Sequence, residues 1–78
     1  MSVTPDQVLD CSGLACPMPI IKTKQAIDGM DAGQVLKMIA TDPGSVSDVT
    51  AWTGRTGHEL VESAHEGDAY VFFLRKKA

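Results

Sequence analysis

The chain has 78 residues, of which 44% are hydrophobic and 22% charged, a composition typical of a single small domain spanning residues 1–78. Its net charge of −3 argues against direct nucleic-acid binding, because phosphate neutralisation needs clustered basic residues. No apolar run reaches the roughly 18 residues of a membrane span, and the N-terminal residues lack the pattern of a secretory signal. We therefore expect a cytoplasmic protein with reduced thiols and no membrane contact, whose basic run Arg75–Lys77 is a solvated strand end.

The first elements in chain order are a short strand and a helix. Val8–Cys11 is apolar enough for a strand, and Ser12 and Gly13 form a tight connection that suits the backbone freedom of glycine. Helical spacing follows, and the turn residues Asp31–Gly33 end it. The apolar stripe of this helix consists of Ile20, Thr23, Ile27 and Met30.

A second strand and a second helix come next. Gln34–Thr41 is almost continuously apolar, as expected of a strand in the middle of a sheet, and short connections to the first strand predict parallel pairing. Ser45 is then expected to cap a short helix over about 46–53. Val49 and Trp52 would face inward in that helix, and Gly54 would end it.

The last third of the chain predicts an antiparallel hairpin. Its strands are His58–His65 and Ala69–Lys76, and its turn is Glu66–Asp68. The order of elements is therefore βαβαββ. We expect an α+β protein, a two-layer α/β sandwich in which a four-stranded mixed sheet carries both helices on one face.

Cys16 is the strongest candidate for a reactive residue. Pro17 follows it directly and Pro19 lies two positions further on, an arrangement that opens a helix, because proline is accepted in the first helical turn. Unpaired N–H groups and the positive end of the helix dipole favour an anion there, and a thiolate is such an anion. The alternative is that Cys16 is a small buried residue at the helix start.

The other potentially reactive side chains have simpler interpretations. Cys11 shares a strand face with Leu9 and is expected to be buried and inert, the alternative being a resolving partner that forms a disulfide with Cys16. His58 and His65 are seven positions apart, which in a regular strand places them on opposite faces. We therefore expect no metal site and no cofactor.

The stretch from Leu9 to Pro19 resembles the opening motif of the TusA/SirA-like sulfur carriers, also called the YedF-like group. That motif is Leu-Asp, two variable positions, Gly-Leu, any residue, Cys-Pro, any residue, Pro. Similar family features follow in the expected order at Ala26-Ile27, Asp42-Pro43, Trp52 and 56–60. The chain departs from the family at Cys11, commonly a small residue such as alanine, and at Thr53, where many relatives have a cysteine.

The resemblance implies a sulfur relay rather than an enzyme with its own small-molecule substrate. Cys16 would accept sulfane sulfur as a persulfide from a cysteine desulfurase or rhodanese-like donor and pass it to an acceptor protein. The relay would serve tRNA thiolation, molybdenum-cofactor maturation or sulfur oxidation. The residues expected to support the motif are Gly13, Leu14, Pro17, Pro19 and Asp10, the alternative for Asp10 being a turn-forming carboxylate at a strand end. Those expected to contact partners are Met18, Lys22 and Lys24, the alternative for the two lysines being solvated helix charges.

A monomer is expected. Two alternatives from other functional classes remain beside the sulfur carrier. One is a redox protein that cycles a Cys11–Cys16 disulfide. The other is an interaction or regulatory module in which Cys16 has a structural role.

Overall fold

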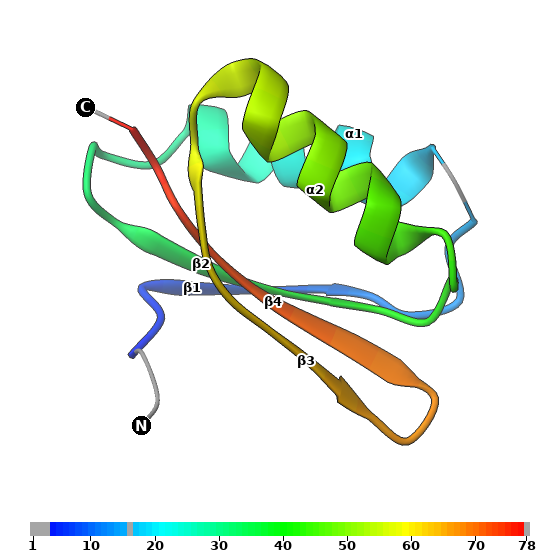
Figure 1. Ribbon diagram of the computed structural model, residues 1–78. Helices are drawn as coiled ribbons and strands as arrows, with labels where there is room; N and C mark the ends of the chain where they lie inside the picture. Colours follow the sequence, from blue (N-terminus) through cyan, green and yellow to red (C-terminus); the bar gives the residue numbers. More distant parts are fainter. Residues whose placement is uncertain (1–3, 16, 78) are drawn as a thin grey trace.

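The computed structural model describes residues 4–15 and 17–77. Its elements are β1 (Gln7–Cys11), α1 (Met18–Asp28), β2 (Val35–Ala40), α2 (Ser45–Thr56), β3 (Glu59–Glu66) and β4 (Ala69–Arg75). Both helices lie on one face of the sheet (Figure 1), which confirms the predicted α+β sandwich with βαβαββ order. Neither helix is long and apolar enough to cross a membrane in the part of the chain that is described.

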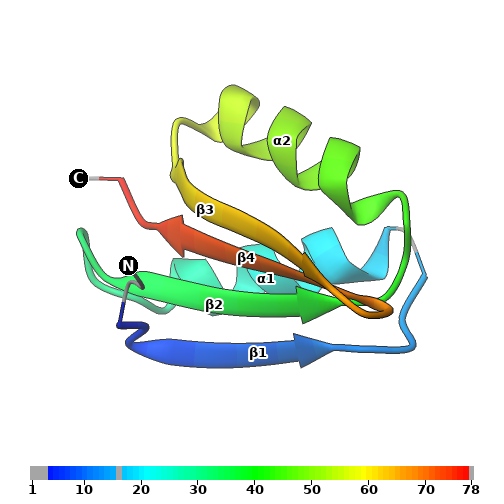
Figure 2. The same ribbon diagram turned by 60° about the horizontal axis from the view of Figure 1, so that its bottom comes forward.

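The four strands form one mixed sheet in the order β1-β2-β4-β3. β1 pairs in parallel with β2, while β4 runs antiparallel to both β2 and β3, as Figure 2 shows. β2 therefore has a neighbour on each side, which accounts for its almost continuous apolar sequence. The predicted parallel β1–α1–β2 unit and the predicted hairpin are both confirmed.

The core lies between the helices and the sheet face that they cover. Alternate residues of the strands point into it, in agreement with the two-residue period of a strand. Trp52 and Val49 face inward from α2, as predicted, and Cys11 is fully buried at the end of β1. The buried core residues are Cys11, Ile27, Met30, Leu36, Met38, Ala40, Val49, Trp52, Phe72 and Leu74.

Both helices end differently from the sequence expectation. α1 ends at Asp28, before the turn 31–33, because its last backbone bonds, from Gly29 to Ala26 at 3.2 Å and from Met30 to Ile27 at 2.9 Å, tighten the final turn. Met30 is buried just beyond this end.

The predicted limits of α2 were also wrong. Gly44 is its N-cap, so Ser45 is a helical residue rather than a cap, and the buried Ser45 hydroxyl finds no hydrogen-bond partner among the described residues. Gly54 lies inside the helix. The helix instead ends at Gly57, whose φ of 87° is the left-handed conformation that ends helices, with its N–H donating to the Thr53 carbonyl at 2.9 Å.

The hairpin contains an irregularity that the sequence did not predict. A register shift between Leu60 and Glu62 changes the alternation of side chains along β3, so that Leu60 and His65 oppose Leu74 and Tyr70, which share one face of β4. The His58 ring lies 5.3 Å from the Trp52 ring, also on the helix side. The predicted placement of the two histidines on opposite faces was therefore wrong.

The C-terminal residues bind the far ends of both helices rather than extending into solvent. Lys76 Nζ donates to the Met30 carbonyl beyond α1, and Lys77 Nζ donates to the Thr56 carbonyl of α2, each at 2.6 Å. The Lys77 N–H donates to His58 Nδ1 at 3.1 Å. Cationic groups at helix C-termini satisfy free carbonyls and complement the helix dipole, so the basic run is partly structural.

Candidate functional site

The candidate site lies at the end of the sheet where β1 and β2 both terminate. Because the two strands are parallel, their carboxyl ends share one edge, and the starts of α1 and α2 lie at this same end of the molecule (Figure 2). The connection from β1 to α1, which carries the predicted motif, spans this edge. Cys16 itself lies outside the described residues, so the site is built from the residues before and after it.

The chain leaves β1 in a hydrogen-bonded turn. Leu14 N–H donates to the Cys11 carbonyl at 3.1 Å, and Gly13 adopts a φ of 81° inside the turn. This conformation is costly for residues with a Cβ, which explains why the motif has glycine there. Leu14 is half-buried and packs against the core.

The Asp10 carboxylate supports the same turn. Its Oδ1 accepts the Ser12 N–H at 2.9 Å. Hydrogen bonding from Ser12, through its side chain and then its backbone N–H, lowers the pKa of Asp10, which is therefore ionised at neutral pH. This local bond is that of a turn-forming aspartate at a strand end, and a role of Asp10 in orienting the motif stays a prediction.

The start of α1 fixes the chain on the other side of Cys16. Pro17 is the N-cap, and Pro19, in the first turn, is buried and accepts the Thr23 hydroxyl at 2.7 Å. Met18 N–H donates to the Ala15 carbonyl at 2.9 Å. The first turn of α1 contains no acidic residue, so nothing within it opposes the positive end of the helix dipole.

Cys11 lies in a very different environment from the surface turn that it precedes. Its side chain is 0% exposed and sits in the core cluster beside Ala40 on β2. Burial raises the pKa of the Cys11 thiol, and the Asp10 charge adds to this, while Lys22 acts weakly in the opposite direction. A buried thiol with a raised pKa is a poor nucleophile at neutral pH.

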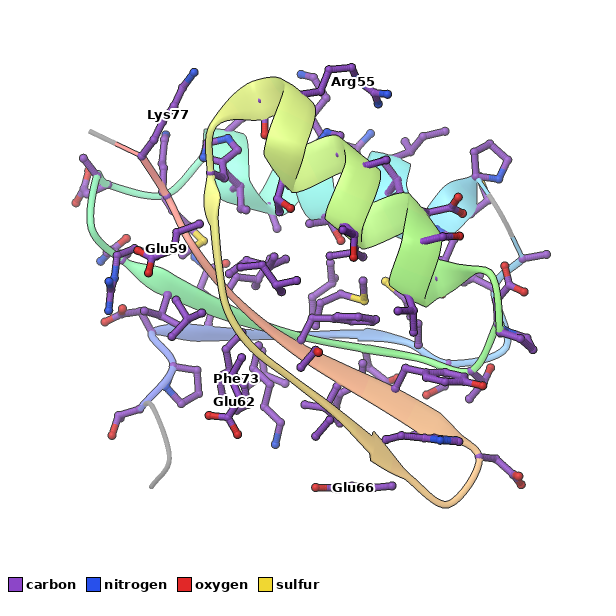
Figure 3. All side chains as sticks on the ribbon, in the orientation of Figure 1. Arg55, Glu59, Glu62, Glu66, Phe73 and Lys77 are labelled. Atoms are coloured by element: carbon purple, nitrogen blue, oxygen red, sulfur yellow. The ribbon has the colours of Figure 1, made fainter. Side chains whose placement is uncertain are left out.

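Exposed apolar side chains surround the start of α1. Met18 and Ile21 are 39% and 41% exposed, so both present apolar surface to solvent beside this turn. A shallow groove of about 190 Å³ separates this turn from α2, lined by Pro17, Ile20, Asp48, Ala51 and Arg55. Figure 3 shows Arg55 projecting from the outer side of α2.

Two lysines of α1 were expected to contact partners. Lys22 is exposed, whereas Lys24 forms an ion pair with Asp28 one helical turn later at 2.7 Å. An exposed pair of this kind contributes little to stability and breaks easily, so Lys24 remains accessible to an acidic partner. Among the described residues, no three His, Cys, Asp or Glu side chains are close enough to hold a metal ion.

The sequence reasoning did not identify three residues of this surface. Ile21 could have been noticed, because it lies off the apolar stripe of α1. Arg55 came from beyond the predicted end of α2. Thr41 follows β2 directly, and its hydroxyl accepts the Gly13 N–H at 2.8 Å across 28 positions of sequence.

These features define a class of protein: a small α+β sandwich in which a cysteine precedes a proline-initiated helix at the edge where two parallel strands end. Comparison with known proteins is consistent with that class. The family described as Sulfurtransferase TusA matches residues 7–76. The chain belongs to this TusA family of sulfur carriers.

Three of the similar proteins match over almost their whole length. A putative sulfur carrier protein, YrkI of Bacillus subtilis, is 49% identical over 71 residues, which are 91% of this chain and 95% of the relative. The sulfur carrier protein TusA of Allochromatium vinosum is 52% identical over 71 residues, 91% of this chain and 93% of the relative. The fold resembles the crystal structure of a SirA-like protein from Desulfitobacterium hafniense, with a TM-score of 0.78 at 19% identity, covering 92% of this chain and 99% of that one.

Proposed function

We propose that Cys16 is the sulfur-carrying residue of this protein. In the proposed step the Cys16 thiolate attacks the terminal sulfur of a persulfide on the donor protein. The sulfur–sulfur bond of the donor breaks, its electron pair leaves with the donor thiolate, and a new sulfur–sulfur bond forms on Cys16. Transfer to the acceptor repeats this exchange with Cys16 as the leaving group, so neither step needs an external oxidant or reductant.

The observation that carries the proposal is the burial of Cys11. The chain has two cysteines, and a carrier thiol must ionise near neutral pH and meet two partners in turn. Cys11 is 0% exposed, and the pKa of its thiol is raised. Cys16 directly precedes the N-cap of α1, where a thiolate is favoured by the helix dipole. The same burial argues against a Cys11–Cys16 disulfide as the main activity.

The partners in this proposal are two proteins. The donor is a cysteine desulfurase or a rhodanese-like protein, and the acceptor delivers sulfur to tRNA thiolation, molybdenum-cofactor maturation or sulfur oxidation. Met18, Lys22 and Lys24 would contact them, with a soft apolar side chain two positions after Cys16 in sequence and positive charges for an acidic partner surface. We further propose that the chain works as a cytoplasmic monomer, since a shared carrier must leave one partner to reach the next.

A loading assay tests the role of Cys16. The purified protein is incubated with a cysteine desulfurase and cysteine, and intact-mass spectrometry measures the gain of one sulfur atom. The wild-type protein and Cys11→Ala should gain sulfur, and Cys16→Ser should not. Sulfur that persists on Cys16→Ser would refute the assignment of the carrier residue.

The two alternative functions give different results in companion measurements. A redox protein would form an internal disulfide under mild oxidation and lose it in Cys11→Ala. A purely structural Cys16 would react with iodoacetamide at neutral pH no faster than an ordinary thiol, whereas a thiol with a lowered pKa reacts faster. Peptide mass spectrometry after alkylation separates labelling at Cys16 from labelling at Cys11.

A further inference from the structure

Directly after β1, the backbone N–H groups of Ser12, Gly13 and Leu14 each donate to a different acceptor. Ser12 donates to the Asp10 carboxylate at 2.9 Å, and Leu14 donates to the Cys11 carbonyl at 3.1 Å. Both acceptors are local and would move with the turn. Gly13 donates at 2.8 Å to the hydroxyl of Thr41, which lies 28 positions further along the chain. Of these three bonds, only the one to Thr41 holds the turn to another element.

Thr41 occupies a fixed point of the fold. The β1–β2 ladder ends with Cys11 opposite Ala40, two fully buried residues, and Thr41 follows Ala40 directly. Its side chain therefore extends the connection between the two strands one step beyond the last paired residues. The backbone of β1 can turn away from the sheet at Gly13 while still bonded to the end of β2.

The segment that carries Cys16 is short and is held on both sides. Thr41 fixes it at Gly13, and the buried Pro19 fixes it in the first turn of α1, where the Thr23 hydroxyl donates to the Pro19 carbonyl at 2.7 Å. Residues 14–18 lie between these two points. Restricting the two ends of so short a segment lowers the entropic cost of aligning it for a reaction.

We propose that Thr41 is a positioning residue for sulfur transfer, acting through the Gly13 N–H on the segment that presents Cys16. The inference rests on the proposed function of Cys16. Thr41 is not proposed to change the pKa or the nucleophilicity of the Cys16 thiol itself. It acts on the exchange with a protein donor, in which two sulfur atoms must be brought into line, and much less on a small reagent that approaches from any direction.

Thr41→Val tests the inference, because valine has the shape of threonine without the acceptor. Gly13 is exposed, so water can replace the lost acceptor and the fold should persist. We expect kcat/KM for loading by a cysteine desulfurase to fall by about threefold to tenfold, the equivalent of one hydrogen bond. The rate of Cys16 alkylation by iodoacetamide and its pH profile should change by less than about twofold. Thr41→Ser, which keeps the hydroxyl, should restore loading.

Thr56→Val is the matched control, since it removes a threonine hydroxyl that donates to the Trp52 carbonyl at 2.8 Å at the opposite end of α2. It should load sulfur like the wild type. An unchanged rate in Thr41→Val, an equal fall in loading and alkylation, or an equal fall in Thr56→Val would each overturn the positioning role. A wild-type protein that takes up no sulfur would instead refute the proposed function, and the inference with it.

Discussion

Two replacements of Cys11 should differ in stability while leaving sulfur loading unchanged. The Cys11 side chain is 0% exposed and packs in the core cluster beside Ala40. Cys11→Ala deletes one buried heavy atom, which typically costs about 0.5–1.5 kcal/mol. Cys11→Ser also removes buried volume, because oxygen is smaller than sulfur, and in addition it places a hydroxyl in an apolar site, where an unsatisfied hydroxyl costs about 1–3 kcal/mol. We therefore expect stability in the order wild type, Cys11→Ala, Cys11→Ser.

Urea unfolding followed by Trp52 fluorescence measures these differences, and thermal melting provides a second readout. For a domain of this size, 1 kcal/mol corresponds to a shift of about 4–8 °C in Tm. The rate of persulfide loading in Cys11→Ala should stay within about twofold of wild type, because the thiol is not in the reaction path. A Cys11→Ser protein as stable as Cys11→Ala, or a large loss of loading in Cys11→Ala, would refute the conclusion that Cys11 is a buried thiol with no part in sulfur transfer.

Two further predictions concern the far end of α2. Gly57→Ala should lower the free energy of unfolding in urea by about 1–2 kcal/mol, because the φ of 87° at Gly57 is left-handed. The control Gly54→Ala lies within the helix with open space around it, so this variant should be as stable as the wild type or more stable. Equal losses of stability in the two variants would contradict the argument. Burial lowers the pKa of His58, and the nearby charges of Lys77 and Lys76 lower it further. The unfolded chain therefore takes up the proton first as the pH falls below about 6.5, the ordinary histidine pKa, and stability should decrease there. The hydrogen bond from Lys77 N–H to Nδ1 is lost on protonation, so urea midpoints should fall more between pH 7.5 and 5 in wild type than in His58→Gln. Parallel pH dependences of the urea midpoint in the two proteins would show that His58 does not contribute to this loss of stability.

The sequence predicted the parts of the fold that depend on local periodicity. Leu9 and Cys11 share a strand face, and the structure packs both at the core. Val49 and Trp52 lie three positions apart and both face inward from α2. These inferences need only the geometric repeat of a helix or strand, which does not depend on the rest of the chain.

The predictions that failed depend on competition between local signals and tertiary contacts. Gly54 is the type of residue that often ends a helix, but α2 continues to Thr56, and Gly57 supplies the left-handed cap. The assumption of a regular strand failed in β3, where the shift between Leu60 and Glu62 reverses the alternation. A bulge is set by pairing with β4, so the sequence of β3 alone does not reveal it.

The limits of sequence reasoning at the site itself follow from the same distinction. Cys16 and the glycine and prolines around it are neighbours in sequence, and their residue types state their backbone roles directly. Thr41 carries no comparable signal, because threonine after an apolar strand is ordinary. Its contact with Gly13 exists only because β1 and β2 are parallel and in the register that places Cys11 opposite Ala40. A register shifted by one residue would turn Thr41 to the other face and leave Gly13 without this acceptor. The motif therefore predicts the reactive residue, while the pairing of two strands determines which acceptor the Gly13 N–H meets.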